Sequence, residues 1–144
     1  MIEVVNLCKS FGDNKVLKNV STRIKKGEKV VIIGPSGSGK STFLRCLNCM
    51  EDPTSGSVIF GGVDIANPKV DINVHRQKMG MVFQHFNLFP NMDILKNMTL
   101  APVEILGKTQ VEAEKKAVEL LEKVGLADRA HAYPQQLSGG QKQR

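Results

Sequence analysis

Short apolar segments in the first half of the chain predict β-strands. Residues 2–7 alternate weakly between apolar and polar, and residues 16–24 and 57–60 form two further apolar segments bounded by turn residues. Residues 29–33 and 79–83 are apolar almost throughout, which is typical of strands buried on both faces. The first half is therefore predicted to be rich in strands.

Helical spacing replaces this pattern further along the chain. Residues 40–50 and residues 94–106 are predicted to be helical, the second with an interruption near Pro102. Thr109 and Glu112 match the S/T-x-x-E capping box that opens a third helix before Gly125. The predicted apolar stripe of that helix consists of Val111, Ala117, Val118, Leu121 and Val124. The second half is therefore predicted to be mainly helical.

The composition is that of a globular protein. Of 144 residues, 41% are apolar and 24% are charged, which suits one domain or part of a larger one. No segment approaches the run of about 20 apolar residues that a membrane span needs. The N-terminus lacks the pattern of a secretory signal, so we expect a cytosolic protein, free or docked on a membrane protein.

Positive charge is concentrated at one end of the chain. Residues 1–45 contain nine Lys or Arg and three Asp or Glu, whereas residues 46–144 contain eleven of each. The net charge of +6 therefore surrounds residues 34–41 and favours an anionic ligand there. Charge alone leaves nucleic acid, a nucleotide and acidic lipid as candidates.

The three cysteines do not indicate a disulfide framework. Cys8, Cys46 and Cys49 are an odd number in a chain without a signal peptide. The C-x-x-C spacing of the last two lies within a predicted helix, which favours packing thiols over redox or metal chemistry.

A glycine-rich loop carries the strongest chemical signal. Residues 34–42 fit the pattern G-x-x-x-x-G-K-[ST], between a predicted buried strand and a predicted helix. Glycines let successive backbone amides turn inward around an anion, and the helix N-terminus adds its positive dipole. The lysine neutralises phosphate charge, and the serine hydroxyl suits Mg²⁺. The candidate phosphate-binding residues are Gly34, Pro35, Ser36, Gly37, Ser38, Gly39, Lys40, Ser41 and Thr42.

A second glycine motif specifies the family that the sequence resembles. Residues 137–141 read Leu-Ser-Gly-Gly-Gln, which resembles the signature motif of ATP-binding cassette (ABC) ATPases. Gln84 matches the Q-loop of that family, and Phe11 lies where the family places an aromatic that stacks on adenine. The resemblance implies ATP and Mg²⁺ as cofactors, with Ser41 and Gln84 as the magnesium ligands and Lys40 as the catalytic residue.

The signature motif has a physical basis of its own. Ser138 can cap the helix that it opens, and two glycines leave the helix N-terminus bare for an anion. In the family this end meets the γ-phosphate held by a second subunit in a head-to-tail dimer. The implied nucleotide contacts are therefore Ser138, Gly139, Gly140 and Gln141.

The resemblance also predicts the domain organisation. We expect an α/β P-loop NTPase core with an N-terminal antiparallel β-subdomain, in which residues 1–84 form the β-rich part. Residues 85–144 would form the Q-loop and a helical signature subdomain. The family places its Walker B carboxylates and switch histidine after the signature, beyond Arg144. We therefore expect a truncated cassette, and residues 1–144 alone to hydrolyse ATP weakly or not at all.

Finer features resemble the ATP-binding subunits of bacterial polar amino acid importers. The resemblance is carried by residues 85–90, which include Phe86, Leu88, Phe89 and Pro90, and by residues 97–102, which read Asn-Met-Thr-Leu-Ala-Pro. In such subunits the segment after the Q-loop receives a membrane permease. This implies permease contact through residues 84–102, indirect work with a solute-binding protein, and a peripheral location on the cytoplasmic face of the membrane. A simpler interpretation is that these side chains pack under the helical half.

Two other functions remain open at the level of sequence. A non-transport ABC protein could use the basic N-terminal part on nucleic acid or ribosomes, although no interleaved aromatics support nucleic acid as a partner. A small-molecule P-loop kinase would suit the length but leaves the Leu-Ser-Gly-Gly-Gln motif unexplained.

Overall fold

The computed structural model describes residues 1–144 and divides them into two compact units. The first unit is Met1–Met81 and the second is Val82–Arg144. The sequence predicts the boundary between the two parts after residue 84, whereas the structure divides the chain after residue 81. Each unit has its own hydrophobic core and is described by itself.

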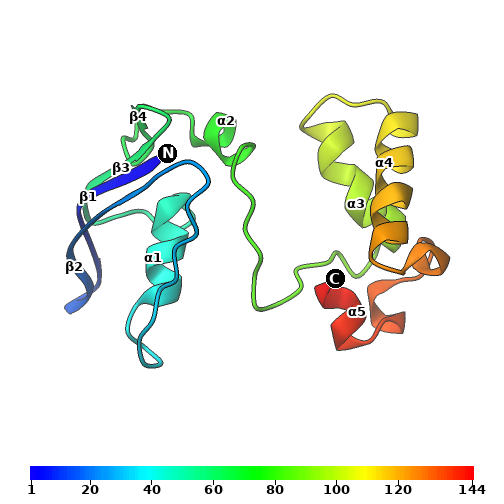
Figure 1. Cartoon of the computed structure of the whole chain (residues 1–144), viewed down its shortest axis with the longest axis horizontal. Helices are drawn as coiled ribbons and strands as arrows, with labels where there is room; N and C mark the ends of the chain where they lie inside the picture. Colours follow the sequence, from blue (N-terminus) through cyan, green and yellow to red (C-terminus); the bar gives the residue numbers. More distant parts are fainter. The chain divides into compact units, whose positions relative to one another are not determined.

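A four-stranded antiparallel sheet forms the frame of the first unit (Figure 1). Its strands are β1 (Ile2–Phe11), β2 (Asn14–Ile24), β3 (Ser55–Phe60) and β4 (Val63–Asp64), in the order β2-β1-β3-β4. Three of the five predicted strands are present as β1, β2 and β3, and each is longer than the apolar pattern indicates. Strands β1 and β2 form a hairpin, so the phosphate-type loop begins shortly after the sheet's edge strand.

A bulge in β1 explains why its alternation is weak. Asn6 and Leu7 lie opposite the single residue Gly56 of β3, because the pairing shifts between Val5–Ser57 and Cys8–Ser55. Asn6 adopts a φ of 50°, and its amide donates to Ser21 Oγ at 2.8 Å. The extra residue turns both Val4 and Leu7 into the core, although they are three positions apart.

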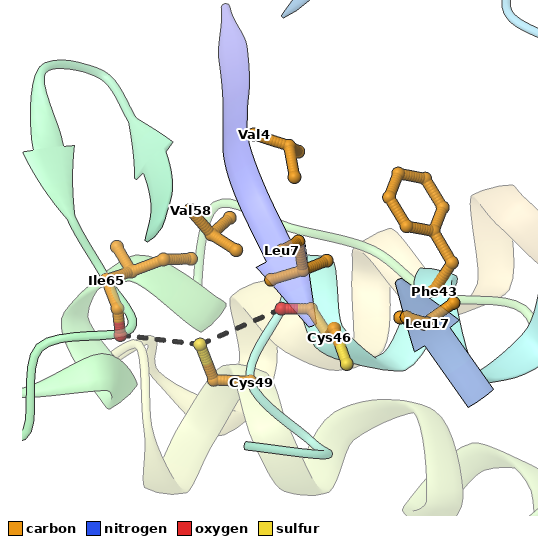
Figure 2. Close-up of a cluster of buried hydrophobic side chains, with 8 residues drawn as sticks. All are labelled: Val4, Leu7, Leu17, Phe43, Cys46, Cys49, Val58 and Ile65. Atoms are coloured by element: carbon orange, nitrogen blue, oxygen red, sulfur yellow. Dashed lines mark hydrogen bonds between the residues drawn. The ribbon is translucent and has the colours of Figure 1, made fainter. Parts of the chain in front are cut away.

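The core of the first unit lies between the sheet and helix α1 (Lys40–Leu47) (Figure 2). Strands β1 and β2 supply three buried aliphatic side chains, and the helix and its C-terminal turn supply an aromatic ring and two thiols. The buried members are Val4, Leu7, Leu17, Phe43, Cys46, Cys49, Val58 and Ile65. This packing fixes the helix that carries the glycine-rich loop at its N-terminus.

Helix α1 is shorter than predicted, and Cys49 lies beyond its end. The chain leaves the helix at Asn48, and Cys49 has a φ of 50°. Its thiol donates to the Ile65 carbonyl oxygen at 3.3 Å (Figure 2). Burial raises the pKa of Cys46 to about 11 and also raises that of Cys49, so both thiols stay protonated. They serve as core-packing groups, as the sequence predicts.

The two predicted buried strands are not strands in the structure. Residues 29–33 and 79–83 have no regular secondary structure, and neither segment pairs with the four-stranded sheet. The side chains of Val31, Ile33 and Val82 are 80%, 90% and 84% exposed. A central parallel strand requires hydrogen-bonded neighbours on both sides, and these segments have none. A short helix that the pattern did not predict, α2 (Ile72–Arg76), lies between them.

The second unit is helical (Figure 1). Helices α3 (Ile94–Glu104) and α4 (Gln110–Lys123) lie side by side as an antiparallel hairpin. They are followed by the 3₁₀ helices η1 (Ala127–Arg129) and η2 (Pro134–Gln136) and by the short helix α5 (Gly139–Gln143). The core of this unit is built on Ile94, Leu121, Leu126, Ala130 and Leu137. No helix of either unit has the length and apolar character needed to cross a bilayer.

The start of α4 confirms the predicted capping box. Thr109 Oγ1 accepts from the Glu112 amide at 3.3 Å, and Glu112 Oε2 accepts from the Thr109 amide at 3.0 Å. Hydrogen bonds from the Thr109 hydroxyl and amide lower the pKa of Glu112.

The predicted apolar stripe of α4 is partly wrong. Val111 and Val118 are exposed, whereas Ala113, Ala117 and Leu121 are buried. At about 100° per residue, the two valines lie well over 100° around the helix from Ala113. The face with the smallest side chains meets the neighbouring helix α3.

Candidate phosphate-binding site

The glycine-rich loop connects residues 29–33 to the first turn of α1. Gly37 and Gly39 have φ values of 81° and 89°, a region that glycine enters at little cost. No side chain caps the N-terminus of α1. The first amides of a helix have no intrahelical acceptor, so the loop presents free N–H groups and a positive dipole at one point.

Lys40 folds back over this loop. Its Nζ donates to the carbonyl oxygens of Gly34 at 2.8 Å and Pro35 at 2.7 Å. The Ser38 amide donates to the Pro35 carbonyl at 3.3 Å, which tightens the same turn. The ammonium group is therefore held at the mouth of the loop by two backbone carbonyls, which suits a lysine that neutralises a bound phosphate.

Space for a side chain is limited at both ends of the loop, and most at Gly39, whose φ is positive. A Cβ atom on Gly34 would lie 2.8 Å from Ser38 Oγ. A Cβ atom on Gly39 would lie 3.0 Å from Val16 Cγ1 and 3.2 Å from Leu17 Cδ2, because β2 passes directly beside the start of α1. The donor set, the lysine and the absence of side chains fit a phosphate group in this loop.

An open cavity of about 600 Å³ lies beside the loop. Its wall is mainly apolar and includes Val20 of β2, Ile33, and Phe43 and Leu44 of α1. Phosphate oxygens need N–H donors and positive charge, so we assign them to the loop amides rather than to this apolar space. Ser41 is exposed at the start of α1, and Thr42 next to it is half-buried.

Phe11 lies at the end of β1 in the same unit as the loop, with a side chain 47% exposed. Lys9 Nζ lies 4.8 Å from the centroid of its ring. The sequence interpretation missed Lys9. Alternation along a strand could have indicated it, because residues two apart point to the same face.

The second unit contains Gln84 and the aromatic loop that follows it. Gln84 is exposed in a bend. Leu88 packs against the core of this unit, whereas Phe86 and Phe89 are 42% and 51% exposed. The loop therefore has both features considered from the sequence, since one side chain packs under the helices and two aromatic rings face outward.

Asn97 of α3 fixes this aromatic loop. Its Oδ1 accepts from the Phe89 amide at 2.7 Å, and its Nδ2 donates to the Phe89 carbonyl at 3.1 Å. The same Nδ2 also reaches the carbonyls of Met92 at 3.0 Å and Asp93 at 2.9 Å. Asn97 enters the sequence analysis only within residues 97–102 of the importer resemblance, and a lone asparagine in a helical pattern gives no signal of a long-range backbone contact.

The signature residues form the start of α5. Ser138 Oγ accepts from the Gln141 amide at 3.3 Å, and Gln141 Oε1 accepts from the Ser138 amide at 2.9 Å. A Cβ atom on Gly139 would lie 3.9 Å from Phe86 Cζ, so the motif begins next to the aromatic loop. Residues 34–42 and Phe11 thus belong to the first unit, and Gln84 and residues 138–141 belong to the second.

A glycine-rich loop closed by a lysine before a bare helix end defines the P-loop class of phosphate-binding proteins. Residues 17–144 match the family described as ABC transporter. The chain belongs to this family. The strand-rich and helical parts and the Leu-Ser-Gly-Gly-Gln motif agree with that assignment.

Relatives and solved structures are similar over the whole chain. It is 56% identical over 144 residues to the glutamine transport ATP-binding protein GlnQ of Escherichia coli K12, and 52% identical to the arginine transport ATP-binding protein ArtM of Bacillus subtilis 168. All of this chain and 60% of each relative are covered. The ATP-binding cassette MJ0796, in a dimeric structure bound to ADP and Pi, is similar with a TM-score of 0.86 and 38% identity over 99% of this chain and 65% of that one.

The matched lengths show that these similarities concern only part of each relative. The chain spans about 60% of the length of the curated relatives. The relatives described here are ATP-binding subunits of amino acid transporters, so neither a nucleic-acid-dependent ABC protein nor a small-molecule kinase is favoured.

Proposed function

We propose that this chain is the ATP-binding part of an amino acid importer, and that the complete protein hydrolyses ATP to drive import. The observation that carries the proposal is the loop geometry: Lys40 lies over two loop carbonyls beside an uncapped helix N-terminus. Family membership and the names of the relatives support amino acid import as the process.

In the first unit, the amides of residues 34–42 would bind the phosphates and Lys40 would neutralise them. The Phe11 ring would stack on adenine, for which its exposure at the end of β1 suits it. Ser41 together with Gln84 of the second unit would hold Mg²⁺, which supplies positive charge to the phosphate oxygens. The roles of these residues follow the family resemblance and the chemistry of their side chains.

In the second unit, residues 138–141 would contact the γ-phosphate held by a second copy in a head-to-tail homodimer. The exposed rings of Phe86 and Phe89 would contact permease subunits within residues 84–102, and a solute-binding protein would act indirectly. This arrangement would place the protein peripherally on the cytoplasmic face of the membrane.

Replacement of Lys40 tests ATP binding. We expect Lys40→Ala to weaken ATP binding at least about tenfold in isothermal titration, because the phosphates lose a close positive charge. Lys69→Ala is the matched control, since this lysine is an exposed residue of the same unit outside the loop. Equal affinity of Lys40→Ala and the unchanged chain for ATP would contradict the proposal.

Replacement of Lys40 in the cell tests whether the protein acts in amino acid import. In a strain whose own gene carries the Lys40→Ala change, we expect loss of energy-dependent uptake of at least one labelled polar amino acid. Uptake of every tested amino acid at the unchanged rate, together with salt-sensitive binding of the purified protein to duplex DNA, would favour the nucleic-acid function instead.

A further inference from the structure

One face of the Phe11 ring is already occupied by a positive charge. Lys9 and Phe11 are two residues apart on β1 and point to the same face of the strand. Lys9 Nζ lies 4.8 Å from the ring centroid, within the range of a cation–π interaction. The Phe11 side chain nevertheless remains 47% exposed, so part of the ring is available to a ligand.

Lys9 is itself held in place by the segment that follows the P-loop helix. Its Nζ lies 2.7 Å from Glu51 Oε1 and donates to the Asp52 carbonyl oxygen at 2.8 Å. The lysine side chain is only 12% exposed. A long side chain with two fixed partners and little solvent contact has one position, unlike a free surface lysine.

The anchoring segment is an extension of α1. The amides of Met50 and Glu51 both donate to the Arg45 carbonyl, at 3.0 Å and 3.2 Å. The residue that holds Lys9 is therefore hydrogen-bonded to the helix whose other end carries the glycine-rich loop. Lys9 thus connects the Phe11 ring to the same element that positions the phosphate-binding amides.

The strand end is held independently of Lys9. The Thr54 amide donates to the Cys8 carbonyl at 2.9 Å, and the Ser10 amide donates to Thr54 Oγ1 at 2.9 Å. These bonds fix the β1 backbone on either side of Lys9. Loss of the lysine side chain should therefore release the ring without displacing the strand.

We propose that Lys9 is a positioning residue for the nucleobase of the bound nucleotide. Its ammonium group fixes the Phe11 ring and occupies one face, so that the base stacks on the other face. The inference rests on the proposed binding of ATP and extends it to a residue outside the motifs. It concerns the base alone, because Lys9 has no place in the phosphate-binding loop.

Two physical effects favour base stacking on this ring. A cation on one face draws electron density from the ring, which strengthens stacking of an electron-rich purine on the opposite face. A ring that is already ordered loses less rotamer freedom when the base binds. Both effects depend on the base and are absent for a ligand that consists of phosphates only.

The test compares ATP with inorganic tripolyphosphate, using the full chain and isothermal titration. We expect Lys9→Met to weaken ATP binding by about three- to tenfold, which is the range of an energetically significant cation–π contact. Tripolyphosphate affinity should stay within about twofold, since it makes no base contact. Lys9→Arg should retain ATP affinity, and Lys18→Met, an exposed lysine of β2, should alter neither ligand.

A double-substitution cycle separates positioning from general electrostatics. Lys9→Met should add nothing to the loss that Phe11→Ala causes, because the lysine acts through the ring. Should Lys9→Met not fold, Glu51→Ala removes the side-chain partner of Lys9 and leaves its hydrogen bond to the Asp52 carbonyl, and it should also weaken ATP binding but not tripolyphosphate binding. Unfolding midpoints measured without ligand identify which variants fold.

The outcomes are distinct. Equal weakening of ATP and tripolyphosphate, additive losses with Phe11→Ala, or unchanged ATP affinity in folded Lys9→Met would each overturn the role of Lys9 and leave ATP binding intact. Absence of ATP and tripolyphosphate binding in the unchanged chain would overturn the proposed function and, with it, this inference.

Discussion

Gly56 is the residue at which the sheet tolerates no side chain. It lies opposite the bulge of β1, with a φ of 91°. A Cβ atom there would overlap the Asn6 carbonyl oxygen and lie 2.7 Å from Leu7 Cα. Both obstacles are backbone atoms of a neighbouring strand, so they cannot rotate away as the end of a flexible side chain would.

We therefore expect Gly56→Ala to lower the free energy of unfolding by about 3 kcal/mol, as the sum of the positive φ and the overlap. Gly61→Ala is the matched control, because Gly61 also has a positive φ, 60°, but nothing within 4 Å of its Cβ position. It should lose only about 1 kcal/mol. Urea unfolding measures both values, and equal losses would mean that the bulge is absent or adaptable.

The phosphate-binding loop shows what can be predicted at the residue scale. Glycine, lysine and serine at fixed spacing specify the loop because the hydrogen bonds of its lysine are local: Lys40 reaches carbonyls only five and six residues away. The contact of Lys9 with Glu51 joins residues that are separated in the sequence by β2, the loop and α1, so it could not be predicted from one stretch of sequence. Local motifs are predictable because few residues determine them.

At the scale of the element, Asn97 joins α3 to the loop before it. The carboxamide accepts from and donates to the backbone of Phe89, as a neighbouring strand would. This pairing orders a segment that has no secondary structure of its own and that presents an exposed aromatic ring. For the proposed permease contact, a loop that is ordered beforehand would lose less conformational entropy on binding.

We expect Asn97→Ala to speed hydrogen exchange of the Phe89 amide by about tenfold or more, since both side-chain hydrogen bonds to Phe89, worth about 1 kcal/mol each, are lost along with those to Met92 and Asp93. Amide exchange measured by NMR gives this rate directly. Asn91→Ala, an exposed asparagine of the same connecting segment, should leave it unchanged. An unaltered Phe89 rate in Asn97→Ala would show that the loop is held by its other contacts.

Helix starts were predictable from the sequence, and helix faces only in part. Thr109 and Glu112 fixed the beginning of α4 because both hydrogen bonds of the capping box form within one turn. Val111 and Val118 were assigned to the core by their apolar character alone. Which face of α4 is buried depends on the elements packed against it, which the residues of α4 alone do not specify.

At the scale of the whole molecule, residues 30–33 are apolar and yet exposed. This segment has the composition of a central strand, yet its side chains are exposed and form part of the wall of the cavity beside the loop. The sheet that the structure contains ends at β2 on one side and at β4 on the other. Burial of a strand of this kind requires partner strands, which its own residues cannot supply.

We accordingly expect Ile33→Thr to change the free energy of unfolding of the 144-residue chain by less than about 0.5 kcal/mol, because the side chain is 90% exposed. Leu7→Ala, which empties a fully buried position, should cost about 2–5 kcal/mol. Urea unfolding of the two variants makes the comparison. A loss in Ile33→Thr as large as that in Leu7→Ala would show that the segment is packed in solution.

The sequence by itself determined the glycine-rich loop before α1, the capped turn of the signature motif and the capped start of α4. Each depends on hydrogen bonds and backbone angles set by residues a few positions apart. Only the tertiary structure decided that Lys9 lies against Phe11, that Asn97 holds Phe89, that Asn6 and Leu7 bulge opposite Gly56, and that residues 29–33 remain unpaired. These features arise between segments far apart in the chain, where the packing of whole elements determines which groups meet.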